Sequence, residues 1–103
     1  MAENISLTET TYYILLSLYR PLHGYGIMQR AAELSGGRVR LAAGTLYGAL
    51  NSMVDKGWIA LLPGEGRKKE YQLTSRGLEV REKELARLRE LVASGAQVLK
   101  EDA

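Results

Sequence analysis

The fold is decided by residues 43–73, which read AGTLYGALNSMVDKGWIALLPGEGRKKEYQL. The first part of this stretch repeats apolar residues at the three- and four-residue spacing of a helix. We predict a helix over residues 43–56 that is closed by Gly57 and buried along one stripe: Leu46, Ala49, Leu50 and Met53. The opposite face is small and polar, with Thr45, Gly48, Ser52 and Asp55, and a flank carries Tyr47 and Asn51.

The second part of the stretch predicts a β-hairpin. Residues 58–62 form a strand-like apolar run, and residues 69–73 alternate polar and apolar side chains. The residues between them, Pro-Gly-Glu-Gly at 63–66, are typical of turns. Trp58 opens the first strand and is expected to anchor the core. Three consecutive cations lie near the hairpin tip: Arg67, Lys68 and Lys69.

Upstream, a first helix is predicted from Ser6 to about Tyr19. Ser6 and Glu9 have the spacing of a capping box, and Pro21 stops the helix. One apolar stripe of this helix consists of Tyr12, Leu15, Leu16 and Tyr19, and a second face carries Ile14 and Leu18. A domain this small has little protein to bury both faces, so we expect a partner chain to cover one of them.

A second helix is predicted over about residues 25–34, ended by the Ser-Gly-Gly sequence at 35–37. His23 stands just before this helix, and we interpret it as a cap or a packing residue rather than as a proton switch or an effector ligand. Residues 38–41, Arg-Val-Arg-Leu, alternate polar and apolar side chains and predict a short strand.

Downstream, a long helix is predicted from Thr74, its N-cap, towards Lys100. Apolar residues repeat along it every seven positions at Leu78, Leu85, Val92 and Leu99. Leu88 fills a position of the second heptad set, and Leu91 and Val98 widen the stripe. This spacing is that of a coiled coil. Arg81 and Gly95 interrupt the second set of heptad positions, so the pattern is imperfect.

Composition excludes several classes of protein. The chain has 103 residues, which fits one compact domain, and no apolar run reaches the length of a membrane span. Its first residues, Met-Ala-Glu-Asn, do not begin a secretion signal, so we expect a cytoplasmic protein. With no cysteine and a single histidine, there is no visible metal set or nucleophile–base pair. We therefore predict a protein that is not an enzyme and needs no cofactor or metal.

The charge is concentrated in the middle of the chain. The net charge is only +2, but residues 38–76 carry +4, whereas residues 1–37 and 77–103 each carry −1. The basic segment contains the predicted helix 43–56 and the hairpin, and a basic patch there is typical of nucleic-acid binding. Arg40 adds charge beside that helix.

The order of elements is that of a winged helix-turn-helix domain with one extra helix. The fold class is therefore mainly α with a small β-hairpin wing. We divide the chain into a winged helix-turn-helix DNA-binding domain with its N-terminal helix, residues 1–75, and a C-terminal dimerisation helix, residues 76–103. A helix with a slim polar face fits a major groove about 12 Å wide.

Four blocks of sequence carry a family resemblance: PLHGYGI at 21–27, GTLYGAL at 44–50, GWI at 57–59 and RKKEYQLTSRG at 67–77. In this order and spacing they resemble the PadR family of transcriptional regulators, in its short-tailed subgroup with a single C-terminal helix. The resemblance covers about residues 7–91. It implies a homodimeric repressor that binds double-stranded DNA at an inverted-repeat operator.

The resemblance also assigns roles to residues. The implied DNA contacts are Thr45, Tyr47 and Asn51 on the recognition helix and Arg67, Lys68 and Lys69 on the wing, while Tyr47 could instead pack against the second helix. The C-terminal helices pair and each packs on the partner's first helix, which gives a dimer interface of Tyr12, Leu15, Leu85, Leu88, Val92 and Leu99.

A small hydrophobic effector is a further expected partner. Some members of the family bind planar compounds by aromatic residues of the C-terminal helix, but here no aromatic residue follows Tyr71. We therefore place the effector pocket at Tyr12, Tyr19 and Leu88. Burial of the tyrosines at a dimer contact without a ligand is the alternative. The alternative to a DNA-binding regulator is a winged-helix protein-interaction module without specific DNA binding.

Overall fold

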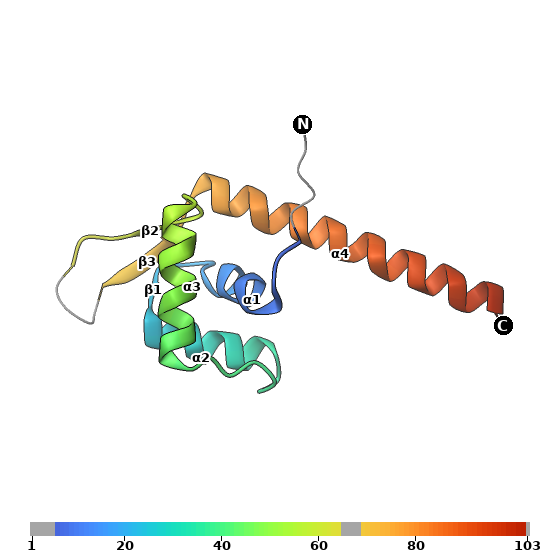
Figure 1. Ribbon diagram of the computed structural model, residues 1–103, viewed down its shortest axis with the longest axis horizontal. Coiled ribbons are helices and arrows are strands. Elements are labelled where there is room, and N and C mark those ends of the chain that lie inside the picture. The colour runs from blue at the N-terminus through green and yellow to red at the C-terminus, as the bar shows by residue number, and fades with distance from the viewer. Residues whose placement is uncertain (1–5, 65–68, 103) are drawn as a thin grey trace.

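The computed structural model describes residues 6–64 and 69–102. Within them the chain forms four helices and a small antiparallel sheet (Figure 1). The elements, in order, are α1 (Glu9–Ser17), β1 (Leu22–His23), α2 (Gly24–Leu34), α3 (Ala43–Asp55), β2 (Ile59–Leu61), β3 (Glu70–Leu73) and α4 (Ser75–Asp102). The fold class predicted from the sequence is confirmed: helices dominate, and β2 and β3 form the wing.

The first two helices are capped differently. The predicted capping box at Ser6 is wrong, because α1 begins two residues later and Thr8 is its N-cap. The Oγ1 of Thr8 accepts a hydrogen bond from the backbone N–H of Thr11 (3.2 Å). In α2, Nδ1 of His23 accepts from the N–H of Gly26 (3.1 Å), so the interpretation of His23 as a cap is confirmed.

The sheet has three strands in the order β1-β3-β2, all antiparallel. Leu22 of β1 lies opposite Tyr71 of β3, and Ile59 of β2 lies opposite Leu73. The third strand is therefore Leu22–His23, and the strand predicted at 38–41 is wrong. There the backbone N–H of Val39 donates instead to the hydroxyl of Ser35 (2.8 Å).

The core lies where α1, α2 and α3 meet. Each of these helices contributes side chains with no exposed surface: Ile14 and Leu15, Ile27 and Ala31, and Leu46 and Leu50. Trp58 is buried beside them, as predicted. Our expectation that a partner chain is needed to bury both apolar faces of this segment is wrong for three of its residues, whereas Tyr12 and Leu16 are half-buried and Tyr19 is exposed. This chain alone buries Ile14, Leu15 and Leu18.

One junction fixes α4 to the wing and to the end of α3. Thr74, predicted as the N-cap of α4, accepts from the N–H of Gly77 (3.0 Å) and approaches the carbonyl oxygens of Gly57 (2.6 Å) and Trp58 (2.9 Å). The backbone N–H of Thr74 also donates to Trp58 (3.1 Å). Gly77 packs so tightly on this turn that a Cβ there would overlap the Trp58 carbonyl oxygen.

A buried carboxylate fixes the N-terminal segment to the middle of α4. The side chain of Glu84 is only 2% exposed and accepts two hydrogen bonds from Arg87, at 2.7 and 2.8 Å. The backbone N–H of Leu7 donates to the same carboxylate (3.3 Å). The Arg87 guanidinium, helped by the Leu7 amide, lowers the pKa of Glu84 below its usual value, although burial acts in the opposite direction.

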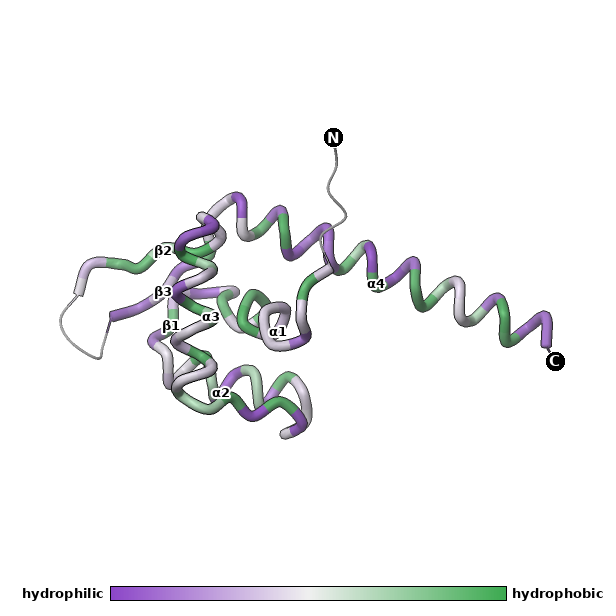
Figure 2. Tube along the Cα trace, viewed as in Figure 1, coloured by the Kyte–Doolittle hydropathy of each residue, from purple (hydrophilic) through white to green (hydrophobic). Residues whose placement is uncertain are grey.

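The second half of α4 leaves the body of the molecule. Figure 1 shows it extending away from the other elements, and every described residue after Leu88 is exposed. The radius of gyration is 15.6 Å, whereas a compact domain of this length has about 13 Å. Apolar residues still recur along this extension (Figure 2). Among the described residues, no helix is long and apolar enough to cross a membrane.

We expect Gly77→Ala to lower the free energy of unfolding by about 1–3 kcal/mol or more, because the added methyl group meets fixed backbone. Gly48→Ala is the matched control. A Cβ at Gly48 meets nothing within 4 Å, so the better helix former should stabilise the protein by up to about 1 kcal/mol. Urea unfolding at one fixed protein concentration measures both changes. Equal effects of the two substitutions would contradict the tight junction.

Glu84→Gln should cost about 1–3 kcal/mol at pH 7, since it removes a buried charge from Arg87. Because the pKa of Glu84 is lowered in the folded protein, its stabilisation is fully present above the unfolded pKa and is lost as the pH falls through the folded one. The stability difference between wild type and variant should therefore shrink in acid, as followed by urea unfolding at successive pH values. The exposed Glu79→Gln should change stability little. A Glu84→Gln difference that is constant with pH would rule out the carboxylate charge as its source.

Candidate nucleic-acid interface

The outward face of α3 is slim, polar and open to solvent. Thr45 and Asn51 are exposed, and Gly44 and Gly48 have no neighbouring atoms where a side chain would stand. The opposite face holds α3 in place through the buried Leu46, Leu50 and Met53. Ala42, the N-cap, makes no side-chain hydrogen bond to the first turn. The first amides of α3 therefore remain available to an anion such as a phosphate.

Tyr47 packs against the start of α2, as one of our two interpretations predicted. A Cβ on Gly24 would overlap its hydroxyl, so the Tyr47 side chain lies directly over that glycine. Burial raises the pKa of Tyr71 in β3, and the nearby Tyr47 adds to this effect. With 43% of Tyr47 still exposed, the packing leaves part of the side chain accessible beside Thr45 and Asn51.

The wing lies at the same end of the molecule as α3 (Figure 1). Its strands are paired up to Leu62, whose N–H donates to the carbonyl of Glu70 (2.8 Å). Lys69, just before β3, is exposed. Arg67 and Lys68, the other two cations predicted for DNA contact, lie outside the described residues. The described part of the wing therefore presents one lysine beyond the end of its paired strands.

The cations before α3 have local partners. Arg38 forms an ion pair with Glu9 and approaches the hydroxyl of Tyr13 (3.5 Å). The hydrogen bond from this guanidinium lowers the pKa of Glu9. Arg40 is exposed and its Nε donates to the carbonyl of Gly37 (3.1 Å). Of the two arginines, only Arg40 is without a carboxylate partner among the described residues.

Sequence reasoning did not single out Tyr25 as a candidate site residue. It is a strongly exposed aromatic residue in the first turn of α2, and its ring stacks on that of the cap residue His23, with the ring centroids 6.5 Å apart. Its neighbour Gly24 is the residue that Tyr47 covers. The signal was the tyrosine two positions after the helix cap, in the sequence His-Gly-Tyr at 23–25.

The residues predicted for a dimer interface differ widely in exposure. Val92 and Leu99 are 71% and 74% exposed, whereas Tyr12, Leu85 and Leu88 are half-buried. Leu15 is completely buried by its own chain and has no surface for a partner, so its inclusion is corrected. Among the described residues, Tyr19 lines two cavities, and neither of these two includes Tyr12 or Leu88.

Comparison with known families decides what this arrangement belongs to. The sequence model of the family described as "Transcriptional regulator PadR-like family" matches residues 13–83, well over half of the chain. The chain belongs to the PadR-like family. The match includes α2, α3 and the wing as well as the start of α4. The resemblance inferred from the four sequence blocks is thus confirmed.

Solved structures are similar to this PadR-like regulator. A PadR family transcription regulator from Clostridium difficile is 26% identical with a TM-score of 0.76, and the match covers 89% of this chain and 99% of that one. A second similar structure is described as the complex structure of RosR-S1, from H. salinarum. Its chain is 26% identical to this one with a TM-score of 0.67, and the match covers 90% of this chain and 95% of that one.

A curated relative shares part of the sequence. It is an uncharacterised 37.1 kDa protein in transposon TN4556 of Streptomyces fradiae, 41% identical over 64 residues. That match covers 62% of this PadR-like chain and 18% of the relative, so the chain spans less than a fifth of the protein it matches.

Proposed function

We propose that this PadR-like regulator binds double-stranded DNA sequence-specifically, with α3 in the major groove and the wing on the flanking backbone. The exposed, slim and polar face of α3 carries the proposal, because it can approach base edges without steric conflict. The sequence of the adjacent wing contains Arg67, Lys68 and Lys69, whose positive charges can pair with phosphates. The net charge of +4 over residues 38–76 supports this assignment.

The two surfaces have different roles in the proposal. Thr45 and Asn51 offer hydrogen-bonding side chains to base edges, and the exposed part of Tyr47 adds a contact to base or phosphate. Lys69, together with Arg67 and Lys68, contacts phosphates, and Arg40 contributes from the segment before α3. The outer face of α3 carries no arginine or lysine, so sequence preference and overall affinity arise from separate residues.

We further propose that two copies pair through α4 and bind an inverted repeat. Val92 and Leu99 continue the heptad of Leu78 and Leu85, and 71% and 74% of their surface is exposed in the described part of the chain. A second α4, together with the half-buried Tyr12 of α1, would bury this stripe. A two-fold pair presents two copies of α3, which matches the symmetry of an inverted repeat.

Repression is proposed on the family resemblance: a dimer bound across an operator blocks transcription, and a small hydrophobic effector releases it. Such a regulator acts on chromosomal DNA and would therefore work in the cytoplasm. The proposal requires no catalytic activity and no cofactor.

The experiment is selection of bound duplexes from a random-sequence DNA pool, followed by titrations of the selected duplex at several salt concentrations. Wild-type protein should enrich an inverted repeat. Lys69→Ala should weaken binding to all sequences and make the slope of log affinity against log salt shallower, by about 0.9 for each phosphate that the variant no longer neutralises. Asn51→Ala should keep the slope and lose about 1–3 kcal/mol of preference at the base pair it reads.

Gln97→Ala, at an exposed position on the distal half of α4, is the control for Asn51→Ala and should leave the base preference unchanged. An unchanged salt slope for Lys69→Ala would remove that lysine from the interface. If the wild-type protein enriched no sequence and lost all DNA binding at physiological salt, the protein-interaction module would replace DNA binding as the function.

Pairing through α4 predicts that Val92→Glu yields monomers, because a carboxylate on the stripe would have to be buried against the partner. The control is Ala93→Glu, about 100° around the helix from Val92 and exposed. Sedimentation equilibrium should show a monomer for the first and a dimer for the second, both with wild-type helical content. A dimeric Val92→Glu protein would place the interface elsewhere.

A further inference from the structure

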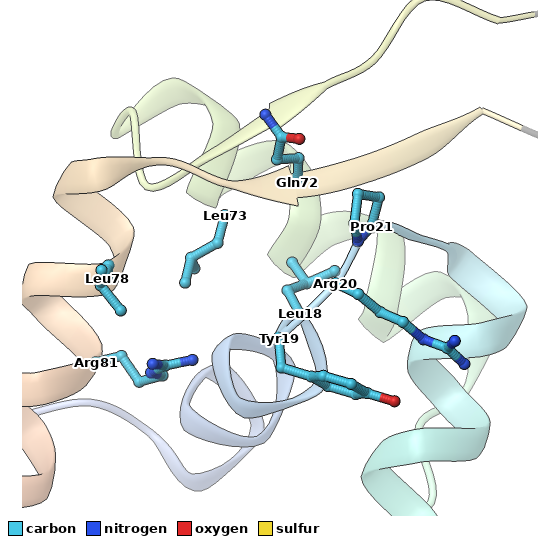
Figure 3. A pocket seen from close by; sticks show the side chains of 8 residues that line it. All are labelled: Leu18, Tyr19, Arg20, Pro21, Gln72, Leu73, Leu78 and Arg81. Carbon is cyan, nitrogen blue, oxygen red and sulfur yellow. The ribbon is translucent and has the colours of Figure 1, made fainter.

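The smaller of the two cavities that Tyr19 lines has a volume of about 230 Å³ and lies between the end of α1 and α2. We call it the α1–α2 cavity. Its lining includes Gly26, Arg30 and Glu33, which are three or four positions apart and so share one face of α2. Figure 3 shows Tyr19 and Arg20, which also line the larger cavity, extending from the end of α1 towards α2. No described residue of α3, β2 or β3 lines the α1–α2 cavity, so it is separate from the surface proposed to read DNA.

Tyr19 brings two arginines close together in this cavity. The guanidinium carbon of Arg30 lies 5.2 Å from the centroid of the Tyr19 ring, and that of Arg20 lies 5.5 Å from it. Both distances are within the range of about 6 Å over which an aromatic ring attracts a cation. Two positive charges beside one ring also repel each other, and an anion bound to both would relieve that repulsion.

The arginines are not neutralised by the described part of the chain. Neither Arg20 nor Arg30 has a carboxylate oxygen within 4 Å there. The Nε of Arg30 is buried and makes no hydrogen bond to any described residue. Buried donors without an acceptor are rare in folded proteins, and water or an ion commonly satisfies them. Arg30 therefore has both a positive charge and a hydrogen-bond donor without a partner among the described residues.

The size and polarity of the cavity limit what it can hold. Sites for drug-sized ligands typically occupy about 300–1,000 Å³, so this cavity suits a smaller group. Gln29 adds a neutral amide to the lining, and the exposed Glu33 adds one carboxylate. With two arginines against one glutamate, the lining has a formal charge of +1. It is therefore suited to a small anion.

We propose that the α1–α2 cavity binds the phosphate group of a small molecule, held by Arg20 and Arg30 together. A phosphate monoester carries a charge of about −1.5 to −2 at pH 7 and three acceptor oxygens, so one group can engage both guanidiniums. Arginine suits this role because its planar donors match the geometry of phosphate. A carboxylate has a single charge and should bind more weakly.

The proposal is tested by titrating isotopically labelled protein at pH 7 and constant ionic strength, without DNA, with phenyl phosphate, inorganic phosphate and benzoate. NMR follows the Nε–H signal of Arg30 and the backbone amide of Gly26. Both signals should move along one saturable curve, and at least one phosphate should bind about tenfold more tightly than benzoate. Tighter binding of phenyl phosphate identifies a site for a monoester, and equal or tighter binding of inorganic phosphate identifies a site for the free ion.

Substitutions in the lining should change the affinity for phosphate in opposite directions. Arg20→Gln and Arg30→Gln should each weaken it about tenfold. Glu33→Gln should tighten it about two- to fivefold, because it removes a carboxylate that repels the anion. Arg89→Gln, on the exposed part of α4, removes the same charge elsewhere and should change nothing.

If Arg30→Gln fails to fold, the exposed Arg20 and Glu33 still decide the matter. The proposal is overturned if neither phosphate moves the two signals. It is also overturned if the four variants bind phosphate as the wild type does, since that result means an adventitious ion only.

Duplex DNA is the competing source of phosphate. If neither small phosphate moves the two signals, but Arg20→Gln and Arg30→Gln make the salt dependence of DNA binding shallower, the arginines contact the DNA backbone and the proposal is wrong. Because the titrations contain no DNA, their result stands apart from whether the protein binds an operator.

Discussion

The hydroxyl of Thr74 holds together three elements that are separated in the sequence. It accepts from the first turn of α4 and lies within hydrogen-bonding distance of the carbonyl oxygens of Gly57 and Trp58, where α3 ends and the wing begins. Gly77 allows the contact because it has no side chain to strike the Trp58 carbonyl. The directions of α3, the wing and α4 are thereby fixed relative to one another. The geometry of any surface that these elements form together therefore depends on this turn.

Much of the fold could be predicted because its signals are local. The stripe at Leu46, Leu50 and Met53 predicted α3 and its buried face, and Gly57, with its positive φ of 76°, ends that helix. The third strand could not be predicted. Leu22–His23 is too short to show alternation, and it is a strand only because Tyr71 and Glu70, far along the chain, pair with it. The alternating residues at 38–41 have no such partner and bond locally.

The site was predictable in its exposed residues and not in its contacts. Helical periodicity alone predicted Thr45 on the outer face of α3 and Asn51 on its flank, and both residues are exposed. The pairing of Arg38 with Glu9 was not visible, because 29 positions separate the two residues in the sequence. Leu15 shows the same difficulty. An apolar stripe predicts that a helix face is buried, but it does not indicate whether the same chain or a partner chain buries it.

The extension of α4 has a consequence for how the amount of protein sets its action. If α4 pairs as proposed, a lone copy has one α3 and one wing with which to grip DNA, and a pair has two of each. While most of the protein is monomeric, the number of pairs rises with the square of its concentration. A twofold dilution, such as one round of cell growth and division without new synthesis, would then reduce the pairs about fourfold. The exposed stripe on α4 would thus make occupancy of an operator a steep function of how much regulator the cell contains.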